Sequence, residues 1–506
     1  MVAPKEGNTL RPMINAGFGH RHIAAACALL AGAVAGLGAS ESTGFSLDDA
    51  YIHLSYARSS ALGQGFSYNP GDWETGASSP LWALMLVPFA TLQDPARAVQ
   101  LLGVVLHGAT ALVCSLGAAR LVAPARAQAA AAIAGVVVAT HPGLLQGALS
   151  GMEVSLTALL LSWALLAMFA KRVALGFGLS VLAVWARPEA ALLLGTAGGL
   201  GWLHTRDRRL LAVPLGAAAG LLAWIVFCLV VSGYPWPNTR YVKSAGTNAA
   251  GLAYFLVQVV PREPWLLGVG GPVLVVLHMR RDLPALERRL PWLLMGAWFA
   301  ASLAVAVTRA LDPAVLFYHH RYFLPLSVVP ALSVGIAAAT SAPRTRLLWV
   351  APVLLLSVWM ALDTQALQRR QEHNIMRLHE EPSRYLASQL PARSVVVVEG
   401  AGASRFFTPR EMTIVDMLGL NDRRIAHSPK ERRPCLYVAA RPTHLMLPDF
   451  MLTAVLPLFR TTTVARWVEP LYAQTITVRP LAVTLYRVDG LSDIARSHCP
   501  HEASQP

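Results

Sequence analysis

The sequence predicts a polytopic α-helical membrane protein that carries a soluble α/β domain at its C-terminal end. Of the 506 residues, 55% are hydrophobic and only 14% are charged, and the mean hydropathy is +0.47. Soluble globular proteins contain about 25% charged residues, so a water-soluble enzyme is excluded. Long apolar runs fill the chain up to residue 363, and charges and prolines recur regularly after it. We therefore expect a transmembrane module at 1–363 and an extracytoplasmic domain at 364–506.

The apolar runs of the first part predict about eleven membrane crossings. A transmembrane helix needs roughly 20 apolar residues, and several runs reach that length while others fall short. They lie at residues 23–38, 98–119, 127–140, 152–170, 173–186, 188–203, 210–232, 264–279, 291–308, 322–340 and 347–362. A further run at 80–92 is too short to span, and we expect it to be interfacial or re-entrant.

Basic residues set the predicted orientation. The net charge of +14 and the pI near 10.0 would also suit a nucleic-acid-binding protein. The Lys and Arg residues, however, lie in short clusters between apolar runs, as in cytoplasmic loops, so no nucleic acid is expected as a partner. With these clusters in the cytoplasm, the N-terminus is cytoplasmic and the C-terminal domain lies outside the inner (cytoplasmic) membrane. Five polar stretches then share the outer face, where we expect a site: 41–79, 141–153, 187–189, 233–250 and 309–321.

The C-terminal part has the pattern of a small α/β domain. A helix is expected at Ser383–Gln389, ahead of the first strand. Buried-strand patterns lie at Ser394–Glu399, Thr443–Leu447 and Ala482–Val488. Two of the five cysteines, Cys435 and Cys499, belong to this domain and can pair if it is extracytoplasmic.

The sharpest functional signal lies in the first outer loop, 41–79. Asp48 and Asp49 directly follow the first apolar run, and an acidic pair so near the bilayer is costly unless it is used or hydrated. One explanation is structural: the two residues cap a helix beginning at Ala50, although capping needs only one of them. The other is that a carboxylate acts as a base in catalysis.

An ordered set of motifs runs through nearly the whole chain. The motifs are Asp48–Ile52, Tyr56–Arg58, Gly63–Gly71, Ser79–Trp82, Ser150–Glu153, Arg187–Glu189, Pro237–Lys243, His319–Pro325 and Asp416–Asp422. In this order they resemble the GT-C superfamily of membrane glycosyltransferases, and most closely the family that includes the actinobacterial terminal arabinofuranosyltransferases. The chain departs from that family at Ala190, where Gly usually follows the Arg-Pro-Glu motif, and this leaves the sugar open.

The resemblance implies a reaction at the outer face of the membrane. A sugar, with a pentofuranose as one candidate, moves with inversion from a polyprenyl-phosphate donor to a glycan, lipid or protein acceptor of the cell envelope. The expected partners are membrane lipid, the donor and the acceptor. Such an enzyme must take a proton from the acceptor hydroxyl and stabilise charge on the departing phosphate.

Roles at the site follow from this chemistry. Asp48 or Asp49 is the candidate base, and the resemblance favours Asp48. Both are also candidate ligands of a divalent cation, Mg²⁺, Mn²⁺ or Ca²⁺. Lys243 and Arg321 are candidates for the donor phosphate, which a guanidinium can grip bidentately; the alternative for Lys243 is contact with lipid head groups. Hydrogen-bonding groups near Lys243 come from Asn238 and Tyr241.

Further polar and aromatic residues are expected to line the substrate cavity. Acidic side chains beside apolar runs, such as Glu153 and Glu189, are costly unless paired or hydrated. Arg187 could simply pair with Glu189 across the break at Pro188. Trp73 and Glu74 could contact sugar or anchor the loop at the interface. The full set is Tyr51, Trp73, Glu74, Glu153, Arg187, Glu189 and His320.

Two other functions compete with that of an enzyme. A transporter or flippase of lipid-linked glycans would also need a cationic outer cavity, but transporters usually show repeated halves, and the sequence has no internal repeat. A membrane scaffold would leave Asp48 and Asp49 without a purpose. An enzyme is therefore the leading hypothesis.

Overall fold

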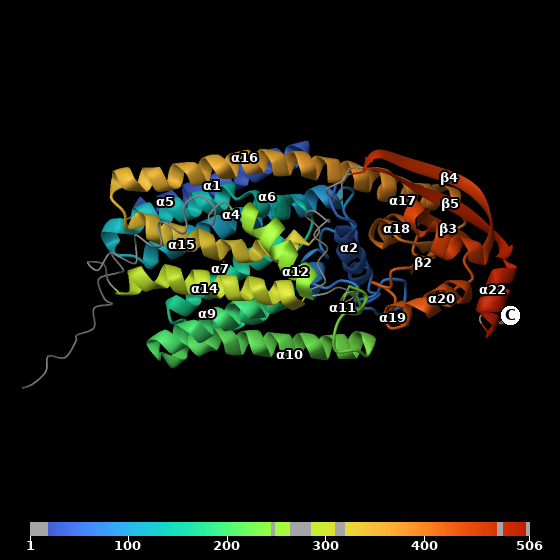
Figure 1. Ribbon diagram of the computed structural model, residues 1–506, viewed down its shortest axis with the longest axis horizontal. Coiled ribbons are helices and arrows are strands. Elements are labelled where there is room, and N and C mark those ends of the chain that lie inside the picture. The colour runs from blue at the N-terminus through green and yellow to red at the C-terminus, as the bar shows by residue number, and fades with distance from the viewer. Residues whose placement is uncertain (1–18, 244–247, 264–284, 309–318, 473–478, 502–506) are drawn as a thin grey trace, which may run out of the picture.

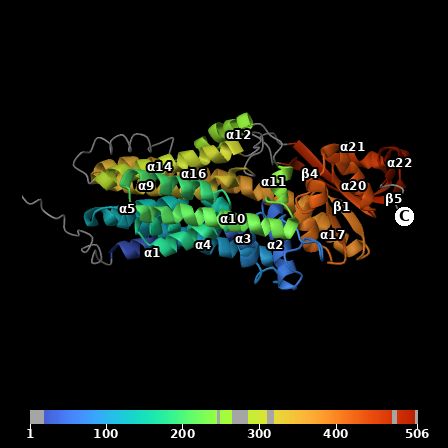
Figure 2. The ribbon, with the colours of Figure 1, turned by 90° about the horizontal axis from the view of Figure 1, so that it is seen from below.

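The structure, a computed structural model, describes residues 19–243, 248–263, 285–308, 319–472 and 479–501. A bundle of helices occupies one end of the molecule, and a five-stranded sheet with short helices occupies the other (Figure 1). The helix α16 (Pro343–Ile375) runs along the bundle towards the sheet, and α2 (Asp48–Ala61) stands at the junction of the two parts (Figure 1, Figure 2).

Within the described residues, five helices are long and apolar enough to cross a membrane. They are α1 (Gly19–Glu41), α4 (Pro95–Arg120), α10 (Ala212–Ser232) with the turn before it, α14 (Ala285–Thr308) and α16 with its continuation into α17 (Glu381–Gln389). The pair α5 (Pro124–Thr140) and α6 (Pro142–Leu149) would be a sixth span, bent by 54°. Pro142 explains the bend, because it lacks the N–H that would continue the α5 hydrogen bonds.

The other apolar runs form shorter helices. These are α7 (Val154–Phe169), α8 (Val173–Ala186), α9 (Ala190–Thr205) and α15 (Val328–Ala339). The short helix α12 (Asn248–Tyr254) lies outside the predicted runs. The run at 264–279 lies outside the described residues, so eleven crossings remain a prediction. The run at 80–92 forms only α3 (Pro80–Met85) followed by turns, in keeping with its short length.

Small residues let the first helices of the bundle approach closely. The buried face of α1 is made of Ala24, Cys27, Ala31, Ala35 and Ala39, three or four residues apart. On α4, a Cβ added to Gly103 would lie 1.9 Å from the carbonyl oxygen of Ala148 on α6. Close backbone packing of this kind is typical of membrane helices. It fixes α4 against α6, and therefore the position of the loop that leads to Glu153.

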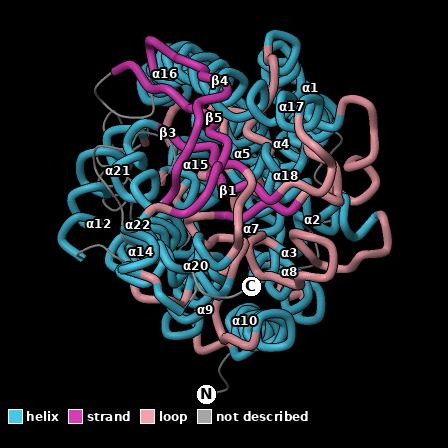
Figure 3. Tube along the Cα trace, turned by 90° about the vertical axis from the view of Figure 1, so that its right-hand side faces the viewer, coloured by secondary structure: helices cyan, strands magenta, loops and turns pink. Residues whose placement is uncertain are grey.

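The C-terminal part is built on a sheet with the strand order β2-β1-β3-β5-β4. Figure 3 draws the strands in magenta. The strand β1 (Val395–Val398) pairs in parallel with β2 (Thr413–Asp416) and β3 (His444–Pro448). The hairpin of β4 (Phe459–Tyr472) and β5 (Arg479–Leu491) adds two antiparallel strands. The accompanying short helices are α18 (Ala401–Phe407), α19 (Arg423–Ala426), α20 (Arg433–Ala439), α21 (Leu452–Val455) and α22 (Asp493–His498). Cys435 and Cys499 form a disulfide.

Candidate active site

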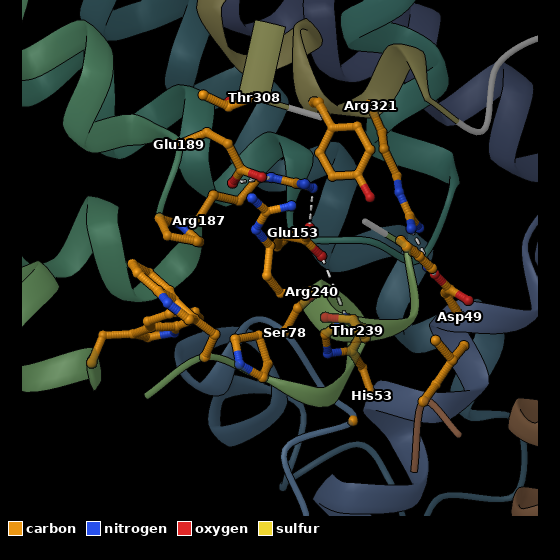
Figure 4. Close-up of a pocket in the computed structure, with 18 of the residues that line it drawn as sticks. Asp49, His53, Ser78, Glu153, Arg187, Glu189, Thr239, Arg240, Thr308 and Arg321 are labelled. Carbon is orange, nitrogen blue, oxygen red and sulfur yellow. Dashed lines mark hydrogen bonds and ion pairs between the residues drawn. The ribbon is translucent and has the colours of Figure 1, made fainter. Parts of the chain in front are cut away.

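A cavity of about 360 Å³ lies where the bundle meets the C-terminal part. Each of the five polar stretches expected on one face contributes to its lining (Figure 4). The lining includes one charged residue from each stretch, in chain order Asp49, Glu153, Arg187, Lys243 and Arg321. Segments far apart in the sequence therefore meet around one hollow.

Asp49 is the acidic centre of one side of this cavity. It lies in the first turn of α2, and its Oδ2 atom is 2.6 Å from Nη2 of Arg321 and 3.6 Å from Nζ of Lys243. The Asp49 side chain is 17% exposed and the Arg321 side chain 5% exposed. In such a partly buried place, charge-assisted contacts are stronger than at the surface. One carboxylate and two cations thus share a single point of the cavity.

A second charged group lines the cavity beside the first. The guanidinium of Arg187 donates to Oε1 of Glu153 and, over 3.4 Å, to Oε2 of Glu189. Nε2 of His53 lies 3.6 Å from Oε2 of Glu153. Arg187 caps the C-terminus of α8, whose hydrogen bonds Pro188 cannot continue. The pairing of Arg187 and Glu189 across Pro188 is therefore present, and both residues also line the cavity.

Asp48 points to the other side of α2, towards the C-terminal part. Its Oδ2 accepts a hydrogen bond of 2.7 Å from the N–H of Gly402, and its Oδ1 accepts one of 2.8 Å from the N–H of Ala403. Nδ1 of His379 lies 3.6 Å from Oδ1. Burial raises the pKa of the Asp48 carboxyl, against the opposing effects of His379 and the two N–H groups. The first N–H groups of α18 have no acceptor within that helix, and the Asp48 carboxylate accepts their hydrogen bonds.

These contacts bear on the two explanations offered for the pair of aspartates. The helix begins at Asp48 and not at Ala50, and neither aspartate caps it, since Leu47 occupies the N-cap position without a side-chain hydrogen bond. The preference for Asp48 as the acid of the site is also at odds with the geometry, because Asp49 is the one of the pair that lines the cavity. Adjacent helical residues point about 100° apart, and the partners on each side decide their roles.

The pair of aspartates does not fit a shared metal ion. Two N–H groups occupy the Asp48 carboxylate, and two cations adjoin that of Asp49. Across the described residues, no group of three or more His, Cys, Asp and Glu side chains is arranged to hold a metal. We therefore assign no step to a divalent cation at these two residues.

Several other predicted residues hold the loops around the cavity in place. The Nδ2 of Asn238, at the start of α11 (Asn238–Val242), donates over 2.8 Å to Oε2 of Glu74. The N–H of Arg423 reaches the other oxygen of Glu74 over 3.3 Å, and burial raises the pKa of this carboxyl to about 7. The Tyr51 hydroxyl donates to Oε1 of Glu380 over 2.5 Å. These contacts join the first loop to α11 and to the C-terminal part.

The remaining candidates lie outside the lining of this cavity. Tyr241 packs on the ring of His427, with 4.1 Å between centroids. Trp73 lies over Gly65, where a Cβ would come within 2.3 Å of its ring. His320 lines a different cavity from that of its neighbour Arg321.

Sequence reasoning missed several residues that line the cavity. They are His53, Ser78, Trp224, Trp236, Thr239 and Arg240. His53 follows Asp49 by four residues, which places both on one face of α2. Arg240 lies within the Pro237–Lys243 motif, three residues before Lys243. Helical spacing from the predicted residues would have found these two, whereas the others carry no such signal.

Comparison with known proteins adds a fold to this geometry. A family model of a domain of unknown function, DUF8728, matches residues 365–487. Among curated protein sequences, none matches this chain. ArnT from Cupriavidus metallidurans bound to undecaprenyl phosphate is similar in structure, with a TM-score of 0.60 and 15% identity, over 92% of this chain and 97% of that one.

Two further solved structures belong beside it. The archaeal oligosaccharyltransferase AglB from Archaeoglobus fulgidus, in complex with an inhibitory peptide and a dolichol-phosphate, has a TM-score of 0.51 and 10% identity, over 95% of this chain and 77% of that one. The mycobacterial arabinofuranosyltransferase AftD has a TM-score of 0.46 and 16% identity, over 94% of this chain and 42% of that one. The GT-C fold predicted from the motifs is confirmed by the first two, and with the long apolar helices it makes this chain a polytopic membrane protein. The likeness to AftD is too weak to argue for a closer relation.

Proposed function

We propose that this chain is an inverting membrane glycosyltransferase that moves a sugar from a polyprenyl-phosphate donor to an acceptor hydroxyl. The observation that carries the proposal is the contact of the Asp49 carboxylate with both Arg321 and Lys243 inside one cavity. A base and two phosphate-binding cations are the groups that such a transfer requires. The undecaprenyl phosphate of ArnT and the dolichol-phosphate of AglB, proteins that share this fold, support the class of donor.

The reaction is a single displacement. The acceptor hydroxyl gives its proton to a carboxylate oxygen of Asp49, and its oxygen forms a bond to the anomeric carbon of the sugar. The bond from that carbon to the phosphate oxygen breaks, and its electron pair leaves with the polyprenyl phosphate. Arg321 and Lys243 stabilise the charge on the departing phosphate. Attack opposite the leaving group inverts the anomeric centre.

A second charged group and two tryptophans of the cavity position the sugar. The buried set of Arg187, Glu153 and Glu189 offers charged hydrogen-bonding groups that pairing holds in place. The rings of Trp224 and Trp236, which line the same cavity with 6.0 Å between centroids, offer apolar faces for a sugar ring. A pentofuranose is one sugar that the motifs favour, and a glycan, lipid or protein of the cell envelope is the acceptor.

The reaction takes place at the outer face of the inner membrane in this proposal. The basic clusters between apolar runs support a cytoplasmic N-terminus, which leaves the cavity and the sheet outside. Cysteine accessibility from either side of right-side-out vesicles tests this orientation at a position in the exposed part of the first loop, such as Asp72→Cys.

The test of the reaction is transfer by the purified full chain in liposomes, with a panel of radiolabelled polyprenyl-phosphate pentoses and hexoses and envelope glycan acceptors. Asp49→Asn should lower the transfer rate by about 10³-fold, within the range typical of a lost general base. Asp72→Asn, on the exposed side of the same loop, is the matched control and should transfer at the wild-type rate. Transfer at the wild-type rate by Asp49→Asn would refute the mechanism.

The same liposomes separate the enzyme from a transporter or flippase. A transporter would move labelled donor across the bilayer and leave the sugar on its lipid, whereas the proposed enzyme moves label to the acceptor. Mass spectrometry of envelope glycans from cells with and without the protein would then identify the sugar and the acceptor.

A further inference from the structure

A second cavity, of about 470 Å³, lies on the other side of the turn that carries Arg321. Its lining comes from α6, from the turn Val260–Arg262 and from α16. The 3-10 turn His320–Tyr322 separates it from the Asp49 cavity, since His320 lines the second cavity and Arg321 the first. The two cavities therefore share one wall.

The side chain of Gln146 lines this cavity and carries a buried amide nitrogen. Gln146 on α6 is 6% exposed, and within the described part of the chain its Nε2 has no hydrogen-bond partner. Burial of an unsatisfied N–H₂ group destabilises a fold, so a core position of this kind would ordinarily hold an apolar residue. A donor at this position is explained if it meets an acceptor oxygen of a ligand.

The charged residues of the lining indicate an anionic ligand. Arg262 and Arg370 contribute two positive charges, and Asp363 contributes one negative charge. Nη1 of Arg262 donates over 3.0 Å to the carbonyl oxygen of Gln258, which holds the side chain near the cavity. Guanidinium groups with an amide donor are the groups that recognise phosphate oxygens.

The apolar surroundings indicate that this ligand is a lipid. Along α16, the side chains of Leu355, Trp359 and Leu362 are between 63% and 73% exposed. They lie on a helix that is apolar enough to span the membrane, so this face meets acyl chains. Trp359 belongs both to this face and to the lining of the cavity. The cavity is thus bordered by polar groups on one side and by an exposed apolar face of α16 on the other.

We propose that the second cavity binds the phosphate head group of a lipid whose chain lies along α16. Its recognition uses Gln146, Arg262 and Arg370, and none of these lines the Asp49 cavity. The site goes beyond the proposed reaction, because it would hold a lipid whether or not transfer takes place. A prenyl phosphate and an anionic phospholipid share the required chemistry.

The experiment counts bound ligand by native mass spectrometry of the full chain, released from phosphatidylcholine nanodiscs, with farnesyl phosphate as the probe. Two molecules are expected per wild-type chain, one for each cavity. Gln146→Leu and the double variant Arg262→Gln/Arg370→Gln should each weaken one of the two binding events at least 10-fold. Farnesol, which lacks the phosphate, and inorganic phosphate, which lacks the chain, should both bind at least 10-fold more weakly.

Ser302→Ala is the matched control for Gln146→Leu. The Ser302 hydroxyl on α14 is also buried without a partner among the described residues, but it lines neither cavity. Both substitutions remove an unsatisfied polar group, so both variants should fold at least as stably as the wild type. Weaker binding by Gln146→Leu alone then reports the site and not a loss of structure.

The possible outcomes are distinct. Unchanged binding in Gln146→Leu and in the double arginine variant, or equal binding of farnesol, would overturn the proposal. If wild type binds one molecule and Gln146→Leu abolishes it, the second site stands while the donor site of the proposed function fails. Displacement of the probe in phosphatidylglycerol nanodiscs would identify bulk phospholipid as the ligand, and its absence would identify a prenyl phosphate.

Discussion

The two sides of α2 show how neighbouring residues divide structure and chemistry. On one side, Asp48 accepts two hydrogen bonds from the main chain of α18, and the Tyr56 hydroxyl lies 3.2 Å from Oδ1 of Asn421. On the other side, Asp49 and His53 line the cavity. The contacts on the side towards the C-terminal part keep α2 in place, and the side towards the bundle carries the proposed base, Asp49. A single helix therefore ties the position of the proposed base to the packing of residues about 350 positions later in the chain.

Gly402→Ala should break this arrangement most severely. A Cβ at this position would lie 2.0 Å from the carbonyl oxygen of Asp48 and 2.9 Å from its Oδ2. We expect a loss of about 1–3 kcal/mol of stability from the clash, and a fall in transfer of about 100-fold because Asp49 moves with the start of α2. Thermal unfolding and transfer assays in liposomes measure the two effects.

Gly36→Ala on α1 is the control for that substitution, because no atom of the described residues lies within 4 Å of a Cβ added there. It should leave transfer unchanged and stability equal or slightly higher. A fully active Gly402→Ala protein would mean that the contact between α2 and α18 has no influence on the site.

Asp48→Asn should have a smaller effect than Asp49→Asn on transfer. The amide keeps the shape of the side chain, but its N–H₂ group faces a main-chain N–H in place of a carboxylate oxygen, at a cost of about 1–3 kcal/mol. We expect kcat to fall about 10-fold with the KM for the donor unchanged, since Arg321 and Lys243 are untouched. Steady-state kinetics of the two variants measure this difference. If Asp48→Asn were as inactive as Asp49→Asn at normal stability, the roles given to the two residues would be reversed.

Glu74→Gln should have the smallest effect on transfer, and its consequence should appear mainly in the pH dependence of stability. Burial raises the pKa of Glu74 from 4.5 to about 7, so the folded protein holds this proton more tightly than the unfolded chain. Its contribution to stability is complete below pH 4.5 and is lost as the pH rises through 7, by up to about 3 kcal/mol.

Thermal unfolding in detergent at steps between about pH 5 and pH 8 measures this contribution, and Glu74→Gln should flatten the curve. The flattening should be partial, because burial also raises the pKa of Asp416, which accepts hydrogen bonds from Asn421, to about 7. A curve as steep as that of the wild type would show that Glu74 titrates no differently in the folded and unfolded states.

The sequence predicted which loops meet at the cavity better than it predicted which side chains point into it. The meeting of five polar stretches followed from the placement of basic clusters, because the parity of crossings puts alternate loops on one face. The choice between Asp48 and Asp49 could not be predicted, since it depends on main-chain groups of α18. The second cavity was invisible for a similar reason, because α6, α16 and the turn before Glu263 each contribute separate residues without a shared motif.

The strands of the sheet were also only partly predictable from the sequence. Strands β1, β3 and β5 coincide with apolar runs that stand out in the sequence, and β1 consists of four valines. Strand β2 contains only two apolar residues, Ile414 and Val415, and much of β4 is exposed, with Arg and Thr along it, so neither stands out in the sequence. Edge strands such as these are specified by their partners more than by their own composition.

Asp48 binds α18 through main-chain N–H groups of that helix, and this affects how the protein can be re-engineered. Apart from the glycine at 402, the identity of the α18 side chains does not enter the two hydrogen bonds. A C-terminal part transplanted from another protein of this architecture would keep the two hydrogen bonds wherever a short helix begins at the same place and has glycine as its second residue. Chimeras that exchange acceptor recognition are therefore best joined within α16, and the first test of a junction is whether the carboxylate of Asp48 still finds those two amides.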